Sequence, residues 1–197
     1  MSADSLVQRL RKAVEALPQG LREHVLEVEA EAVRLARLHG LDAERLRIAA
    51  LGHDIARAQS DDRLLALARS HGVPADEVER ASPILLHGPI GARLLEGEYG
   101  YGDPEVLAAV AAHTTARPGM SALEKALFIA DKIEQEKVSR KPALAAVRAL
   151  AESDLDAAML RFLDLHLIEA VERRWQVHPR TVAARNELLA RTPRPPA

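Results

Sequence analysis

The segment Ala50-Leu51-Gly52-His53-Asp54-Ile55-Ala56 places a histidine next to an aspartate in an otherwise apolar stretch with helical character. A carboxylate on such a face is costly to bury unless a charge or hydrogen bonds compensate it. A divalent metal ion would compensate the carboxylate of Asp54 and would also bind the imidazole of His53. Adjacent His and Asp residues also occur as a surface pair, or where a histidine is hydrogen-bonded to a helix cap. The metal interpretation therefore needs support from elsewhere in the chain.

Four further histidines and aspartates adjoin segments that should be buried. They come from different predicted helices, so helix packing can bring them to one point. Their donor atoms are nitrogen and oxygen only, a set that suits iron, manganese, zinc, cobalt or nickel, with six-coordinate iron or manganese the best match. The candidate metal ligands are therefore His24, His53, Asp54, His87, His113 and Asp131.

The other four histidines stand in different surroundings. His39 and His71 each precede a glycine at a predicted helix end, where the helix dipole favours histidine. His166 lies in a charged amphipathic helix, and His178 precedes Pro179 in a turn. We interpret all four as structural or solvated residues.

Composition and periodicity predict an all-α fold. The chain has 197 residues, 48% of them apolar but only 3% aromatic, so its core must consist mainly of Leu, Ala, Val and Ile. No strand pattern of useful length appears, and we expect one domain over 1–197, with a core at about 19–134 and C-terminal helices in 141–191 packed on it. The expected helices cover residues 4–17, 21–38, 43–58, 63–70, 82–95, 103–113, 121–131, a stretch from 141, 153–174 and 179–190.

Several function classes are excluded or disfavoured by composition. The chain has no cysteine, which excludes disulfides, thiolate catalysis and Cys-ligated metal sites. We see no signal peptide and no apolar run of the roughly 20 residues needed to cross a bilayer, so we expect a cytoplasmic protein without a membrane partner. The formal charge is −2, and neither a basic stripe nor an aromatic platform indicates nucleic-acid binding.

The ordered set His24, His53-Asp54 and Asp131 resembles the signature of the HD-domain phosphohydrolases. The additional pair, His87 and His113, resembles the branch of that superfamily that binds two metals.

Longer stretches narrow the resemblance. Residues Leu86 to Ala92 (LHGPIGA), His113 to Thr115 (HTT) and Ile129 to Glu134 (IADKIE) are similar to the bacterial YqeK-like proteins, the HD-type symmetrical bis(5'-nucleosyl)-tetraphosphatases. The late stretch Pro179 to Asn186 (PRTVAARN) resembles the C-terminal region of the same family. The similarity covers about residues 21–189.

This resemblance implies a hydrolase that converts diadenosine tetraphosphate into two ADP, with two divalent or mixed-valence metal ions, most often iron. One metal would be held by His24, His53, Asp54 and Asp131. Asp54 would bridge to a second metal held with His87 and His113. A hydroxide shared by the metals would attack phosphorus, and His53 and Asp54 would be central to catalysis.

Basic and hydroxyl groups beside the ligands are candidate phosphate contacts, namely Arg57, Thr114, Thr115 and Lys132. The alternatives are solvated helix residues for the two cations and helix-terminating roles for the threonines.

Three departures from the family pattern concern substrate choice rather than the ligands. Gln135-Glu136-Lys137 replaces Pro, any residue, Arg. Arg57 replaces a lysine, and Leu21 stands where a basic residue is usual, with Arg22 next to it.

Two other functions remain open at this stage. One is an HD-type nucleotidase or cyclic-nucleotide phosphodiesterase, and the other is a catalytically inactive nucleotide-binding sensor. A homodimer is also open, because Trp175 at a helix end would suit either a dimer contact or packing within the chain.

Overall fold

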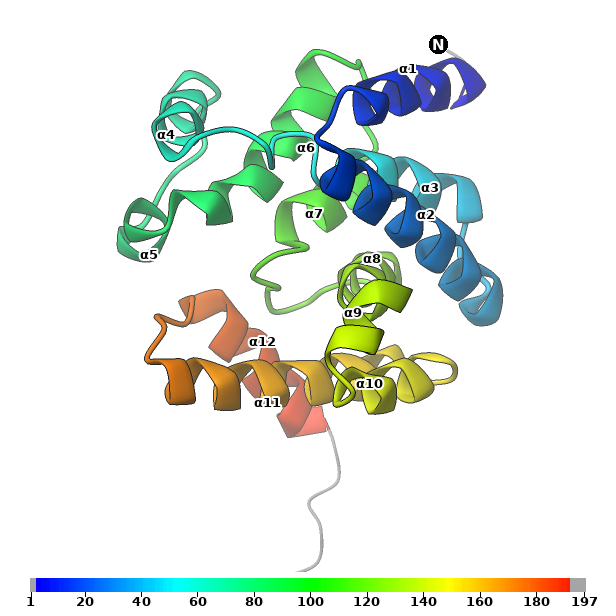
Figure 1. The fold of residues 1–197 in the computed structure, drawn as a ribbon, viewed down its shortest axis with the longest axis vertical. Helices are drawn as coiled ribbons and strands as arrows, with labels where there is room; N and C mark the ends of the chain where they lie inside the picture. The colour runs from blue at the N-terminus through cyan, green and yellow to red at the C-terminus, as the bar shows by residue number, and fades with distance from the viewer. Residues whose placement is uncertain (1–2, 192–197) are drawn as a thin grey trace, which may run out of the picture.

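The computed structural model describes residues 3–191, and within that range the fold is all-α, as predicted, with no β-strand (Figure 1). One short 3-10 helix, η1, interrupts the α-helices. The elements are α1 (Ala3–Glu15), α2 (Gln19–His39), α3 (Ala43–Gly52), α4 (Asp61–Ser70), α5 (Glu77–Ala81), η1 (Pro83–Leu86), α6 (His87–Gly97), α7 (Pro104–Ala112), α8 (Ala122–Ile133), α9 (Gln135–Arg140), α10 (Leu144–Ala151), α11 (Leu155–Arg173) and α12 (Pro179–Arg191).

Helix α8 lies at the centre of the molecule. It packs against α2, α3 and α7 on one side and against α10 and α11 on the other, and Figure 1 shows it between these two groups. A capping box fixes its start, because Ser121 accepts from the N–H of Glu124 while the Glu124 side chain accepts from the N–H of Ser121. Nearly every residue of α8 is buried. This helix therefore carries Asp131 into the interior.

A smaller apolar cluster holds the segment that leads to His87. It joins α4 to η1 and α6 through Leu64, Ala68, Leu86 and Ile90. Because a 3-10 helix and a short α-helix are marginal on their own, this packing is what stabilises them.

The helix predicted over 43–58 is wrong in its second half, since α3 ends at Gly52 and His53 is its C-cap. Beyond Gly52 the backbone bonds join residues three apart, as in Arg57 N–H to Asp54 O, instead of four apart. Gly52 also lies against α6, where an added Cβ would come within 2.8 Å of a Leu95 methyl carbon. Helix α3 thus ends where α6 packs closely against it, and His53 and Asp54 lie on the turn that follows.

Two other boundaries differ from the prediction. The element expected over 82–95 divides into η1 and α6, and an additional helix, α9, follows α8 directly. Asp42 and Ser60 are the N-caps of α3 and α4, each with a side-chain oxygen that accepts one or two backbone N–H groups. No helix in residues 3–191 combines the length and the apolar character needed to cross a membrane.

We expect Asp103→Asn to reduce stability by about 0.5–1 kcal/mol at pH 7. Asp103 caps α7 and forms a two-bond ion pair with Arg45, at 2.8 Å for each bond. The hydrogen bonds from Arg45 lower the pKa of Asp103 below its ordinary 3.8. A lowered folded-state pKa adds stability that is present above pH 3.8 and is lost as the pH falls through the folded value.

Urea unfolding at pH 7 and at pH 3 measures this effect. The difference between wild type and Asp103→Asn should shrink at pH 3, because asparagine keeps the cap and lacks only the charge. An equal difference at both pH values would show that the ion pair is not its source.

Candidate functional site

Six side chains from separate parts of the chain converge on one internal point. They come from α2, the turn after α3, the start of α6, the end of α7 and α8, so every residue predicted as a ligand arrives at the same place. Five of them are 5% exposed or less, and the His24 side chain is 15% exposed. A hollow of about 190 Å³ opens beside them. The six are His24, His53, Asp54, His87, His113 and Asp131.

Asp54 lies between two groups of histidines. Its Oδ1 is 3.0 Å from Nε2 of His87 and 3.5 Å from Nε2 of His113. Its Oδ2 is 3.5 Å from Nε2 of His53 and 3.7 Å from Nε2 of His24. One carboxylate therefore presents a different oxygen to each pair, which is the arrangement a bridging ligand requires.

Asp131 belongs to only one of these groups. Its Oδ1 is 3.0 Å from Nε2 of His24 and 4.0 Å from Nε2 of His53. The six side chains thus divide into a cluster with two histidines and Asp131 and a cluster with two other histidines, and Asp54 joins them.

Three of the histidines are oriented by the same kind of local hydrogen bond. Nδ1 of each ring lies within hydrogen-bonding distance of the backbone carbonyl three residues earlier, which belongs to Ala50 for His53, Ile84 for His87 and Val110 for His113. A carbonyl only accepts, so Nδ1 carries the hydrogen and, in the neutral ring, Nε2 has a lone pair. All three lone pairs point to the centre.

The centre requires a cation. Burial lowers the pKa of His53 to about 4 and also lowers that of His87, so both rings are neutral at pH 7. Nε2 of His53 is buried without a hydrogen-bond partner, and Nε2 of His87 is 3.0 Å from Nε2 of His113. A divalent transition metal would satisfy these nitrogen atoms and the carboxylates together, and the Nδ1 bonds are those that metal-bound histidines commonly make.

Two lysines balance the charge of Asp131. Burial opposes its charged form, but the ammonium groups of Lys132 and Lys137 hold its pKa well below the usual range. Lys132 contacts Oδ2, and Lys137 lies 2.8 Å from Oδ1. Glu134, which is buried, accepts the N–H groups of Glu136 and Lys137 as the N-cap of α9, and this turn brings Lys137 back to the site.

Lys137 is a site residue that the sequence analysis did not select. It stands where the family pattern has arginine, so the position keeps a cation with a different head group. A cation at the position of the family's arginine was the feature of the sequence that could have identified Lys137 as a site residue.

The predicted phosphate contacts have different surroundings. Arg57, Thr114 and Lys132 line the hollow beside the ligands. The Thr114 hydroxyl lies 3.3 Å from Nε2 of His87 and 3.2 Å from Nε2 of His113. Thr115 is buried and its hydroxyl donates to the carbonyl of Ala116, so its side chain forms a hydrogen bond within the loop.

The four other histidines lie apart from this centre. His39 contacts the carbonyl of Ala151 through Nε2, His71 is the C-cap of α4, and the His166 ring is parallel to that of Phe162. His178 is buried, with Nε2 3.2 Å from Asp76 and 3.5 Å from Glu79.

The group of Asp76, Glu79 and His178 does not suit a metal. Nδ1 of His178 accepts the backbone N–H of Arg180 at 3.1 Å, so the hydrogen of the neutral ring lies on Nε2. Nε2 is therefore a donor facing two carboxylates rather than a ligand with a lone pair.

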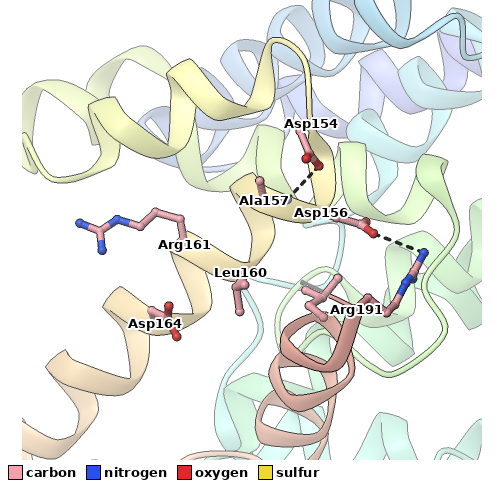
Figure 2. Close-up of a pocket in the computed structure, with 8 residues that line it drawn as sticks. Asp154, Asp156, Ala157, Leu160, Arg161, Asp164 and Arg191 are labelled. Atoms are coloured by element: carbon pink, nitrogen blue, oxygen red, sulfur yellow. Dashed lines mark hydrogen bonds and ion pairs between the residues drawn. The ribbon is translucent and has the colours of Figure 1, made fainter. Parts of the chain in front are cut away.

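A larger hollow, about 490 Å³, lies between α11 and α12, away from all six predicted ligands (Figure 2). Its carboxylates already have partners in this region. Asp154 accepts the N–H of Ala157 as the cap of α11, Asp156 pairs with Lys125 and Arg191, and Asp164 pairs with Arg185. We therefore place the candidate site at the smaller hollow, where the histidines are.

Comparison with known proteins identifies a family and several similar proteins. The HD domain family model matches residues 21–136. The symmetrical bis(5'-nucleosyl)-tetraphosphatase of Bacillus subtilis is 32% identical over 91% of this chain and 97% of its own length. The protein of the same name from Halalkalibacterium halodurans is 34% identical, over 85% and 88% of the two chains.

A solved structure has the same architecture. A crystal structure described as a predicted HD superfamily hydrolase involved in NAD metabolism, from Clostridium acetobutylicum, superimposes with a TM-score of 0.88 at 32% identity. The match covers 98% of this chain and 99% of the other.

We expect Gly88→Ala to destabilise the protein by about 1–3 kcal/mol, because the site leaves no room for a methyl group there. An added Cβ would lie 3.0 Å from the carbonyl oxygen of Val110 and 3.2 Å from Nδ1 of His113. Gly97 on the same helix has nothing within 4 Å, so Gly97→Ala is a matched control and should change stability by no more than about 0.5 kcal/mol. Urea unfolding of both variants measures this, and equal stabilities would contradict a tight contact between α6 and α7.

Proposed function

The chain belongs to the HD-domain family, and we propose that it hydrolyses diadenosine tetraphosphate symmetrically into two ADP. Relatives of nearly equal length carry the name of this activity, and the similarity extends well beyond the HD match into the C-terminal helices. The observation that carries the proposal is the position of Asp54, whose two oxygens face two separate histidine pairs.

The donor set supports two metal positions joined by Asp54. His24, His53 and Asp131 would hold one ion, and His87 and His113 would hold the other. Iron is the ion we propose, since a mixed imidazole and carboxylate set suits six-coordinate iron or manganese.

Divalent ions in such a centre supply Lewis acidity, which activates water at neutral pH and neutralises charge on phosphoryl oxygens. The chain's own residues keep the donors in place. The Nδ1 bonds to Ala50, Ile84 and Val110 fix the ring orientations, so no ring has to turn when substrate binds.

Cations around the hollow suit a polyphosphate. Arg57 and Lys132 line it, and Lys137 lies 2.8 Å from Asp131, which also lines it. We propose that these three bind phosphate oxygens, with Thr114 as a hydroxyl donor. Scission at the middle of the tetraphosphate leaves ADP, whose terminal phosphate is a weak base, so protonation of the leaving group is not essential.

Incubation of purified, metal-analysed protein with diadenosine tetraphosphate should give ADP as the sole nucleotide product. Chromatography of the products separates the alternatives. AMP plus ATP would place the cut elsewhere. Turnover of nucleoside monophosphates or cyclic nucleotides in preference to the tetraphosphate would favour the other HD-type activities. Binding of nucleotide with no turnover by iron- or manganese-loaded protein would favour the inactive sensor.

Asp54→Asn should lower metal content and reduce turnover by more than about 100-fold, since even the loss of an outer-shell partner costs about 10–100-fold. The metal-free variant should still fold, because the amide has nearly the shape of the carboxylate it replaces. Elemental analysis, product assays and thermal unfolding measure these effects. His71→Gln, remote at the end of α4, is the matched control and should retain metal and activity. Full metal content in Asp54→Asn would overturn the ligand assignment.

Other expectations from the sequence stay predictions. These are a homodimer, a cytoplasmic location, and the absence of nucleic-acid and membrane partners. Trp175, considered for a dimer contact, is half exposed and lies against the guanidinium of Arg173.

A further inference from the structure

The stretch His178-Pro179-Arg180-Thr181 opens α12, outside the segment that matches the HD domain and without a ligand of the centre. Two of its three polar side chains are nevertheless buried, with His178 and Thr181 each 4% exposed. A buried polar group is costly unless it is bonded, so the partners of these two residues indicate what the stretch does.

Thr181 reaches the loop that carries His113. Its hydroxyl donates a buried hydrogen bond of 2.7 Å to the backbone carbonyl of Thr115, 66 positions earlier in the chain. Ala116, the next residue, has φ of +58°, a left-handed conformation that is unfavourable for a residue with a Cβ. Such a conformation persists where surrounding contacts enforce it, and the carbonyl held by Thr181 belongs to the peptide that joins Thr115 to Ala116.

A second bond from α12 reaches the same loop further along. The carboxylate of Glu187 accepts the N–H of Gly119 at 2.7 Å. Two side chains two turns apart on one helix thus hold the segment 113–119 against α12.

His178 contacts the segment that precedes His87. Its Nε2 faces the carboxylates of Asp76 and Glu79, which form the capping box at the start of α5. Helix α5 leads through η1 directly to His87. The first turn of α12 therefore contacts both the segment that precedes His87 and the loop that follows His113.

We propose that Thr181 is a positioning residue for the His87 and His113 half of the centre, with His178 as the second anchor. In this role α12 acts through backbone geometry. Thr181 holds the Thr115 carbonyl, the held carbonyl fixes the left-handed turn at Ala116, and the turn fixes where the end of α7 presents His113. His24 and Asp131 lie on α2 and α8, so their positions do not depend on α12 in this way. The catalytic part of this inference rests on the proposed function.

Thr181→Val removes the hydroxyl while keeping the shape, and Thr181→Ser keeps the hydroxyl. In the full-length chain, Thr181→Val should speed amide hydrogen exchange in residues 113–119 by about tenfold or more, with or without added manganese. It should lower the bound metal from two ions per chain towards one. It should also lower kcat by about 10–100-fold, the range for outer-shell partners, with KM changed less than about threefold. Thr181→Ser should restore the exchange rate, the metal content and kcat.

Leu188→Ala is the control for general loosening of α12. Leu188 is buried on the same helix, 4% exposed, and lines the hollow between α11 and α12, so its truncation enlarges the space there. It should lower the melting temperature while leaving exchange in 113–119 and the metal content unchanged. Equal losses in Leu188→Ala and Thr181→Val would overturn the proposal.

The two proposals fail in different ways. If wild type binds two metals and cleaves the tetraphosphate but Thr181→Val matches it in exchange, metal content and kcat, the positioning role is wrong and the function stands. If wild type neither binds metal nor cleaves the tetraphosphate, the function fails. The exchange measurement then still decides whether Thr181 holds the loop, and unchanged exchange would overturn that as well.

Discussion

The burial of two carboxylates among imidazole nitrogens is the constraint on which this structure depends. Asp54 and Asp131 are each 5% exposed, and a charge so removed from water must be compensated within a few ångströms. Asp131 is compensated by two lysines that reach it from α8 and α9. Asp54 is surrounded instead by Nε2 atoms of four histidines, three of them oriented with the lone pair inward. An added cation is the simplest source of the missing compensation.

This requirement explains where the ligands stand in the fold. His53, His87 and His113 lie at helix termini, where a carbonyl three residues earlier is available to the ring nitrogen Nδ1. In a regular helix interior that carbonyl is occupied by a backbone N–H. At Ala50 and Val110 one bond therefore does two things, since it satisfies a terminal carbonyl and orients a donor. The Ile84 carbonyl accepts the backbone N–H of His87 as well as its ring N–H. The same local solution at three places gives a rigid centre from short helices.

The sequence predicted the all-α class and the six side chains that meet, because each depends on local pattern or on a polar residue beside an apolar run. Other features depend on contacts that no local pattern contains. The end of α3 at Gly52 accompanies the approach of Leu95 from α6. The position of Lys137 depends on Glu134, which caps α9 and turns the chain back towards Asp131. Both are consequences of packing between segments, and a propensity argument cannot foresee them.

The segment that matches the HD domain is not sufficient to account for the geometry of the centre. It ends at residue 136, one residue before Lys137, which contacts Asp131, and long before Thr181, which holds the loop after His113. Residues beyond the match thus reach both halves of the centre, one by charge and the other by backbone position. A ligand set fixes which ions can bind, whereas these outer contacts fix where the donors stand, and a difference of about 1 Å in such positions is enough to change turnover by orders of magnitude. The C-terminal helices therefore contact the segments that carry the six side chains, although none of the six comes from them.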